Sequence, residues 1–423
     1  MEEHEILNNE YFKVNRFLLK LTGLWPYQKR HVKLIIRILY ICAIHSMMIP
    51  QVIRTVEEWG KDFEIVLENI VGFIYLQCVL AKYVITFMAE PQLVFLYKKM
   101  ALDWTRYIEA EEQLSLQRAA SNGQLMTIIY SVYVNFAGVG FATLPGTLPT
   151  ILNIIAPLNE SRPTKVLCFY AEYFIDQEEY YYQLLFQTFI GVMSTVFINA
   201  TVDTLYVICA HHSDGLFNIV SYRFQKAFNK SQERYQLKSR NLVAAKNLDE
   251  EIHEYVLTAI NIHNESIEYS ILHVVLEFTC FHLFINLIQS TYTLYFFIQM
   301  SLTIISLSLA TVVVNYHAMM NLDDIINLIR IFFIWCGIIL NLAYISIAGQ
   351  QIIDTSLQIF DSAYFCGWYN HPLKTQRLLK FIMLRCSRQC QITAGPMLVI
   401  NLESCSNILK SSLSYCTFMI AVS

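Results

Sequence analysis

The sequence of 423 residues contains few charged side chains. Asp, Glu, Lys and Arg make up 15% of it, whereas about 25% is usual in soluble globular proteins. Hydrophobic residues make up 55%, and no Pro-, Gly- or Ser-rich linker divides the chain. We therefore interpret the chain as a single membrane domain rather than as several soluble domains.

Other absences exclude classes of function. The formal net charge is only -4 and no basic patch is interleaved with aromatics, which argues against nucleic acid as a partner. No GxSxG, HExxH, P-loop or GxGxxG element lies in a suitable context, so we do not expect an enzyme. Cys386 and Cys390 are four residues apart without a nearby His or Cys pair, so we expect no metal and no cofactor. We predict that His211 and His212 are solvated at a membrane interface.

Hydrophobic blocks of membrane-spanning length recur along the chain. A bilayer core of about 30 Å needs about 20 helical residues. One block holds 45 residues without a formal charge and would measure about 68 Å as one helix, so it either projects beyond the bilayer or crosses it twice. The sequence therefore predicts an all-α polytopic membrane protein with seven spans, or eight as the alternative. The predicted helices cover residues 34–53, 65–88, 124–144, 181–210, 278–322, 331–353 and, less apolar than the others, 394–421.

The distribution of Lys and Arg predicts the orientation. Of the 30 basic residues, 23 lie in segments 1–37, 89–123, 211–270 and 374–388, and five lie in the opposite segments. Basic residues are retained on the cytoplasmic side of short loops, so we predict a cytosolic N-terminus and, with seven spans, an extracellular C-terminus. The first twenty residues hold four glutamates and no continuous apolar core, and we expect them to stay inside rather than to form a cleavable signal peptide.

This topology divides the chain into segments. Residues 1–33 form a cytosolic segment, 34–353 a bundle of six helices, 354–392 a cytosolic region and 394–421 the last helix. The bundle includes an outer loop at 145–180, with a sequon at Asn159 that is a candidate glycosylation site, and a cytosolic loop at 211–270.

The last predicted helix carries a polar stripe. Charged groups within a span face a bundle interior or a water-filled path, so the stripe either lines a conduction pathway or forms a polar seam between paired helices. Beyond it, Phe418 and Val422 are suited to a hydrophobic constriction, although ordinary packing explains them equally well. The stripe, with spacings typical of one helix face, consists of Glu403, Ser406, Lys410, Ser414 and Thr417.

Aromatic residues are dense in the outer halves of the middle helices. Together they could line an apolar cavity that binds small volatile hydrophobes by shape and dispersion. Core packing is the alternative at each position. The candidates are Phe73, Tyr133, Phe136, Phe141, Tyr181, Phe186, Phe189, Phe332, Phe333 and Trp335.

The C-terminal third resembles the insect odorant receptor family, and the N-terminal segment 21–26 adds a diffuse similarity. The ordered set of matching residues spans about 75 positions and is highly specific. It comprises Gly349, Gln350, Gln351, Asp354, Ser356, Asp361, Ser362, Ala363, Tyr364, Trp368, Tyr369, the basic stretch to Arg385, Thr393, Ala394, Gly395, Leu402, Glu403, Ile408, Leu409, Lys410, Ser414, Tyr415 and Thr417.

The resemblance implies a ligand-selective subunit of an odorant-gated, nonselective cation channel. Such subunits assemble as hetero-tetramers with a shared co-receptor, in the plasma membrane of olfactory neuron dendrites. By this resemblance, residues 374–390 form a cytosolic anchor helix, 394–421 line the pore, and Phe418 and Val422 lie nearest its gate. The odorant cavity lies among helices 2 to 6 in the outer leaflet. A secondary transporter or a metabotropic seven-helix receptor is the alternative function.

The chain departs from the family pattern in two places. Residues 268–270 would ordinarily run almost directly into 286–288, so 271–285 resemble an insertion, which we interpret as a retained intron or a gene-model error. If the segment is genuine, an eighth span becomes possible. The stretch after Tyr415 also differs from the usual family ending.

Overall fold

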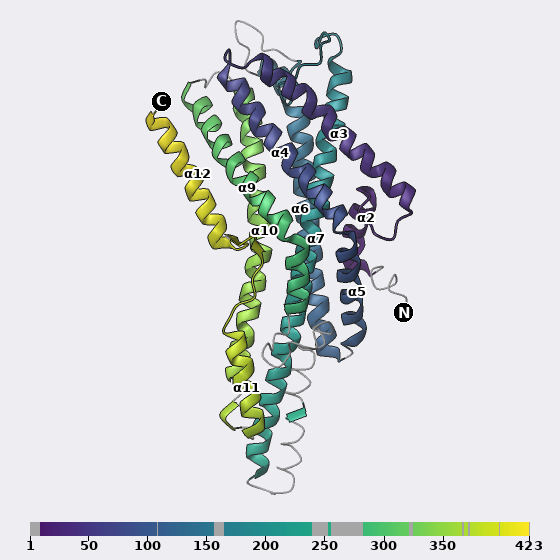
Figure 1. Cartoon of the computed structure of the whole chain (residues 1–423), viewed down its shortest axis with the longest axis vertical. Coiled ribbons are helices and arrows are strands. Elements are labelled where there is room, and N and C mark those ends of the chain that lie inside the picture. Colours follow the sequence, from purple (N-terminus) through teal and green to yellow (C-terminus); the bar gives the residue numbers. More distant parts are fainter. Residues whose placement is uncertain are drawn as a thin grey trace.

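A computed structural model of the chain describes residues 9–107, 109–155, 165–238, 253–254, 282–320, 325–365, 368–370, 373–396 and 398–422 (Figure 1). These residues are almost entirely helical. The elements are η1 (Glu10–Phe12), α2 (Lys13–Leu21), α3 (Arg30–Glu57), α4 (Phe63–Met88), α5 (Glu90–Arg106), α6 (Ala110–Ile155), α7 (Tyr181–Lys238), α9 (His282–Met320), α10 (Ile325–Phe365), η2 (Trp368–Asn370), α11 (Leu373–Cys386), β1 (Thr393–Ala394), β2 (Leu398–Val399) and α12 (Leu402–Val422).

The all-α membrane fold predicted from the hydrophobic blocks is confirmed. Six described helices are long and apolar enough to cross a membrane, and each contains most or all of one of the first six predicted spans: α3, α4, α6, α7, α9 and α10. α12 is not among these six because Glu403 and Lys410 lower its hydropathy. It lies beside α9 and α10 and completes the bundle as its seventh long helix (Figure 1).

The long charge-free block forms one helix rather than two. α9 has 39 residues and no Gly or Pro, so nothing in its sequence favours a turn that would allow a second crossing. At about 1.5 Å per residue its length is about 59 Å, and it projects beyond a bilayer core of about 30 Å. Of the proposed insertion, residues 271–281 lie outside the described part of the chain. Residues 282–285 begin α9, where Phe284 and Ile285 are buried in the main hydrophobic core.

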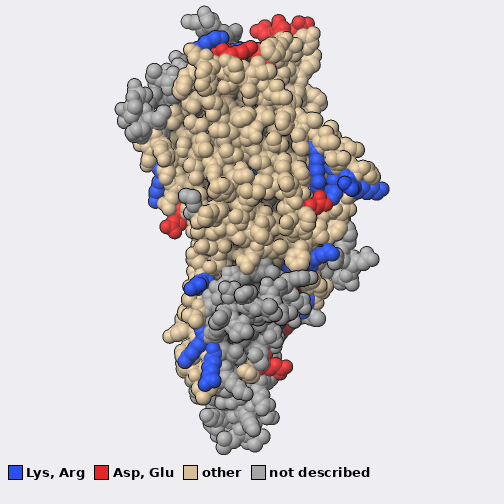
Figure 2. Space-filling view, viewed as in Figure 1, with Lys and Arg blue, Asp and Glu red and all other residues tan. Residues whose placement is uncertain are grey.

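One face of the bundle carries an uncharged belt. On the face shown in Figure 2, the belt lies between charged residues at the upper end and further charged residues from about mid-height downward. α7 and α10 continue below the other labelled spans, and α11 lies beside the lower part of α10 (Figure 1). The belt is where lipid can cover the protein without burying a charge.

α7 is the central helix. Its spanning part is almost wholly buried, whereas the other spans leave most of their residues partly or fully exposed. Gly191 allows α3 to approach closely, because a Cβ at this position would overlap the sulfur atom of Met47. This packing places α7 where its polar side chains can contact several helices at once.

The last helix begins later than predicted. Residues 394–401 are not helical, because β1 and β2 form a small antiparallel hairpin whose turn contains Gly395 at φ 64°. Gln289 of α9 fixes the hairpin, since its amide donates to the Thr393 carbonyl at 3.0 Å and accepts from the Thr393 N–H at 2.8 Å. α12 therefore starts at Leu402 from a hairpin attached to the bundle.

Candidate functional site

The helices of the bundle line a cavity of about 170 Å³. Its wall is formed by α3, α4, α6, α7, α9 and α10, together with Cys168 and Phe169 from the segment before α7. Most of the wall is apolar, as in Leu76, Val79 and Ile338. A cavity of this type favours a small hydrophobic molecule, which binds through shape and dispersion.

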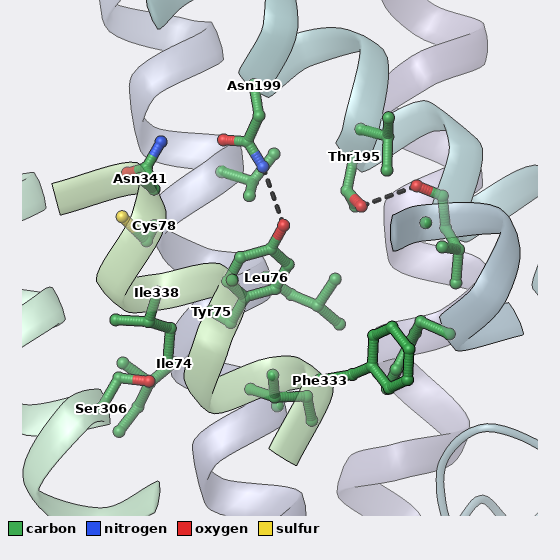
Figure 3. Close-up of a pocket in the computed structure, with 18 of the residues that line it drawn as sticks. Ile74, Tyr75, Leu76, Cys78, Thr195, Asn199, Ser306, Phe333, Ile338 and Asn341 are labelled. Atoms are coloured by element: carbon green, nitrogen blue, oxygen red, sulfur yellow. Dashed lines mark hydrogen bonds between the residues drawn. The ribbon is translucent and has the colours of Figure 1, made fainter. Parts of the chain in front are cut away.

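Three of the aromatic residues predicted to bind ligand lie on this wall. Tyr133 and Phe141 belong to α6, and Phe333 belongs to α10 (Figure 3). Because these three residues line the same cavity, they remain candidates for ligand contact.

The other predicted aromatics lie elsewhere. Phe136 and Phe186 are 77% and 66% exposed and face outward from the bundle. Tyr181 packs with Leu167 and Leu184, away from the cavity. Phe73, Phe189, Phe332 and Trp335 are also outside the cavity wall, and the Trp335 indole donates to the Thr311 hydroxyl at 3.1 Å. Lipid and a cavity favour the same apolar side chains, so the hydrophobic pattern does not separate the two locations.

The cavity also has polar residues that the aromatic pattern did not indicate. Tyr75 projects into the centre of the view in Figure 3, and its hydroxyl accepts a hydrogen bond from the Asn199 amide at 2.8 Å. Cys78, Ser306 and Asn341 complete much of this polar wall (Figure 3). An apolar cavity with a few polar positions can orient a ligand as well as retain it.

A fully buried carboxylate lies behind one end of the cavity. Asp203 of α7 accepts hydrogen bonds from Lys82 at 3.1 Å, Tyr130 at 2.9 Å, Tyr295 at 2.6 Å and Asn341 at 2.6 Å. These donors come from α4, α6, α9 and α10. One side chain therefore connects five helices, and three of its partners also line the cavity.

The neighbours of Asp203 make its charge tolerable in the bundle. A buried ion costs several kcal/mol of desolvation unless it is paired and hydrogen-bonded. The Lys82 ammonium supplies the opposite charge, and the three neutral donors satisfy the remaining acceptor positions of the carboxylate. We call Asp203 and its four donors the charge centre. We infer that the charge centre holds the five helices in a specific arrangement, because a shift of one helix would leave its donor unpaired.

A second buried ion pair borders the cavity nearer the other end of α4. Arg330 donates to Glu68 at 2.7 Å, and its guanidinium lies 4.3 Å from the centre of the Tyr170 ring. Arg330 is one of the five basic residues that the sequence placed in the segments opposite the cytosolic ones. The structure instead buries it within α10, so it does not belong to a loop. Removing it from the count leaves the strong imbalance of basic residues between the two sides unchanged.

The family model for the 7tm odorant receptor matches residues 62–413. The chain belongs to the odorant receptor family. This family is one of receptors rather than of enzymes, and the resemblance found in the C-terminal third is confirmed over most of the sequence.

Solved structures show the same fold for this odorant receptor. The insect olfactory receptor OR5 from Machilis hrabei in complex with eugenol matches with a TM-score of 0.69 at 11% identity, with both chains covered over their whole length. The structure of OR5 from Machilis hrabei, without a ligand named in its description, matches with a TM-score of 0.67 at the same identity and coverage. No curated protein sequence matches the chain.

The polar stripe of the receptor's last helix faces away from the bundle. α12 packs on α9 and α10 through Cys405, Ile408 and Ser412, which are buried. On the opposite face the more exposed members of the stripe are Glu403, Lys410, Ser414 and Thr417, with Ser406 partly buried beside them. Within the described residues, neither Glu403 nor Lys410 forms an ion pair with another helix. The alternative of an internal seam paired within one chain therefore has no support here.

Some predicted sites lie beyond what the structure describes. Asn159 is outside the described residues, and so are the side chains of Phe418 and Val422, although the backbone of both belongs to α12. The glycosylation and gate assignments therefore remain predictions.

The prediction for the two histidines of the receptor is wrong. His211 and His212 are buried rather than solvated, because the neighbouring helices cover this part of α7. The His212 ring lies 3.1 Å from Asp103 of α5, which places a titratable pair inside the protein.

The charge centre was missed, although the sequence contains a signal for it. Lys82 and Asp203 are isolated charges of opposite sign within two predicted spans. Each would be costly in lipid alone, so their simplest arrangement in a membrane bundle is as partners. Glu68 also lies within a predicted span, but its partner Arg330 lies one residue before the predicted span 331–353, so the sequence contains only half of this signal for the second pair.

Proposed function

We propose that this odorant receptor is a ligand-selective subunit of a ligand-gated, nonselective cation channel. The observation that carries the proposal is the mostly apolar cavity between spanning helices. Its volume of about 170 Å³ is similar to that of an engineered cavity of about 150 Å³ that binds benzene. The ligand is therefore a small hydrophobic volatile molecule.

The outward-facing stripe on α12 supports a channel. Glu403 and Lys410 lie on a face that the described residues leave uncovered, and such groups are costly against lipid. Assembly around this face would place the stripe on a shared, water-filled pore. We propose a hetero-tetramer with the family's shared co-receptor, in the plasma membrane of olfactory neuron dendrites.

The proposed orientation places the N-terminus in the cytosol and the C-terminus outside. The excess of Lys and Arg in the segments assigned to the cytosol supports it. In this orientation α11 is a cytosolic anchor between subunits, and the cavity opens toward the outer leaflet.

The cavity and the proposed pore share two helices. α9 and α10 contribute cavity residues on one side and pack against α12 on the other. A ligand that fits the open arrangement better than the closed one will shift the equilibrium by the difference in its binding free energy. Ligand binding can thus open the pore through α9 and α10.

Co-expression with the shared co-receptor tests this function. A panel of small volatile hydrophobes should evoke a cation current that cells with the co-receptor alone do not show. Because the channel is opened directly by ligand, the current should survive blockade of G proteins. A current that disappears under that blockade would indicate a metabotropic receptor, and ligand uptake without a gated current would indicate a transporter.

A further inference from the structure

The Asp203 carboxylate fixes the orientation of the Asn341 side-chain amide. The Asp203 carboxylate accepts hydrogen bonds and donates none, so the Asn341 side chain must turn its NH₂ group toward it. The same NH₂ group donates to the Tyr130 hydroxyl at 2.6 Å, and this hydroxyl in turn donates to Asp203. The Asn341 carbonyl oxygen therefore points away from the charge.

The orientation of the Asn341 amide in turn fixes that of the Gln299 amide of α9. The Gln299 NH₂ group donates to the Asn341 carbonyl oxygen at 2.8 Å. Turning the Gln299 amide around would place two carbonyl oxygens against each other, so its own oxygen, Oε1, must face elsewhere. The buried Asp203 carboxylate thus fixes the orientation of the Asn341 and Gln299 amides, and Gln299 Oε1 points away from Asn341.

This oxygen is a buried acceptor on a residue of the cavity wall. Gln299 is 3% exposed and lines the cavity, and its Oε1 has no hydrogen-bond partner among the described residues. Gln51 and Asn69 also line the cavity with unpartnered oxygens, but no buried charge fixes the direction of their amides. A buried carbonyl oxygen left unpaired carries a desolvation penalty, which a purely apolar ligand would leave in place.

We propose that the ligand is an alcohol or a phenol whose hydroxyl donates to Gln299 Oε1, with its apolar body against the rest of the wall. The inference rests on the proposed function, because it names the chemical class of ligand for the same cavity. The hydroxyl would extend a hydrogen-bonded chain from the ligand through Gln299 and Asn341 to Asp203. Bonds in such a chain polarise one another, so a bound hydroxyl also strengthens the contacts that hold α7, α9 and α10 together.

Isosteric ligand pairs test this inference. Each pair exchanges a hydroxyl for a methyl group: p-cresol with p-xylene, and benzyl alcohol with ethylbenzene. Affinity is measured on the full-length chain in lipid nanodiscs from the dose dependence of ligand-induced thermal stabilisation, which does not require channel activity. In the unsubstituted chain the hydroxyl member of each pair should bind more tightly.

Two variants locate the acceptor. Gln299→Met keeps the volume of the side chain but removes the carbonyl oxygen, and should reduce the preference for the hydroxyl member about tenfold. Ser306→Ala tests the rival polar group, since it removes an unpartnered hydroxyl from the same helix and the same cavity, and the preference should persist if Gln299 is the acceptor. Ser301→Ala is the control, since it removes a hydroxyl from an exposed position of the same helix outside the cavity wall. Comparing the preference between variants cancels the difference in solubility between the two ligands.

The outcomes separate the inference from the proposed function. Equal preference in the unsubstituted chain and in Gln299→Met, or a loss of preference in Ser306→Ala instead, overturns the inference alone. If Gln299→Met does not fold, the unsubstituted chain decides, and tighter binding of the methyl members overturns the inference. Stabilisation by no member of any pair overturns both the inference and the cavity as the ligand site.

Discussion

Individual side chains in this receptor act through partners that are distant in sequence. Asp203 is the clearest example, because its four donors lie on four other helices. Sequence reasoning found the apolar character of the cavity but only three of its aromatic wall residues. Which side of a helix faces a cavity and which faces lipid depends on neighbouring helices, and Phe136 and Phe141 on α6 are the same residue type with different surroundings.

Asp203→Asn should destabilise the receptor strongly. The substitution leaves the Lys82 ammonium buried without its counter-ion, and breaking such a pair typically costs about 3–5 kcal/mol. The measurement is the thermal midpoint of the purified chain together with its surface expression. Asp354→Asn, on an exposed part of α10, is the control. The double variant Asp203→Asn with Lys82→Met should recover part of the loss, and equal stability of the two Asp variants would contradict the prediction.

Filling the cavity should abolish ligand binding without unfolding the receptor. Gly337 of α10 lines the cavity, and a Cβ added there would meet no other atom within 4 Å. Gly337→Leu therefore places its side chain in the space proposed for the ligand. We expect at least about a tenfold loss of affinity, equivalent to about 1.4 kcal/mol, in the thermal-stabilisation assay. Leu340→Phe adds bulk to an exposed position of the same helix and should have little effect on affinity. Unchanged affinity in Gly337→Leu would place the ligand elsewhere.

At the scale of whole elements, the hydrophobic blocks predicted the helices well but not their ends. Six spans follow directly from runs of apolar residues, because a helix in lipid must satisfy its own backbone. The hairpin before α12 was missed although Gly395 and Pro396 form a Gly-Pro pair that is typical of turns, because the apolar residues on both sides were interpreted as one continuous helix. Its conformation depends on contacts with α9 and α10, which a local pattern does not contain.

Separating the hairpin from α10 should uncouple binding from opening. A Cβ at Gly349 would overlap the backbone oxygen of Ile400, which lies between the hairpin and α12. Gly349→Val should therefore displace the start of α12 while the cavity, about two turns away along α10, stays intact. We expect ligand-induced stabilisation to persist and the ligand-evoked current to fall by at least about tenfold. A current that remains normal would show that this contact does not transmit the signal.

The contact between α3 and α5 should weaken in acid. Lys33 and Arg37 both bond to Glu90; burial alone would raise the pKa of this carboxyl, but the two basic partners outweigh it and lower the pKa below its ordinary value. Because the pKa of Glu90 is lower in the folded state, the stabilisation from this contact is complete above the ordinary glutamate pKa of about 4.3. It decreases as the pH falls below that value and is lost below the lowered folded-state pKa. The thermal midpoint should decrease in that range, and less so in Glu90→Gln. The same acid dependence in both proteins would assign the effect to other groups.

At the scale of the whole molecule, the proposed assembly involves α12, which the described residues cover on one face only. Ser414 and Ser412 provide a matched pair, because they are two residues apart on opposite faces of this helix. In the assembled channel, a cysteine at Ser414 should be modified by a water-soluble thiol reagent when ligand is present, with a change in current. A cysteine at Ser412 should not react, because it packs against the bundle. Equal reactivity at both positions, relative to the unsubstituted chain, would contradict a pore along the stripe.

The pairing of Lys82 with Asp203 also has a consequence for biosynthesis. The two residues are 121 positions apart, so at about 5–20 residues per second the ribosome makes Asp203 roughly 6–24 s after Lys82. During this interval the newly inserted α4 holds an ammonium group without its counter-ion, at a cost of at most about 2.5–3.5 kcal/mol, the value for a charge at the centre of a spanning helix. We therefore expect α4 to become more stable in the membrane once α7 has been inserted beside it.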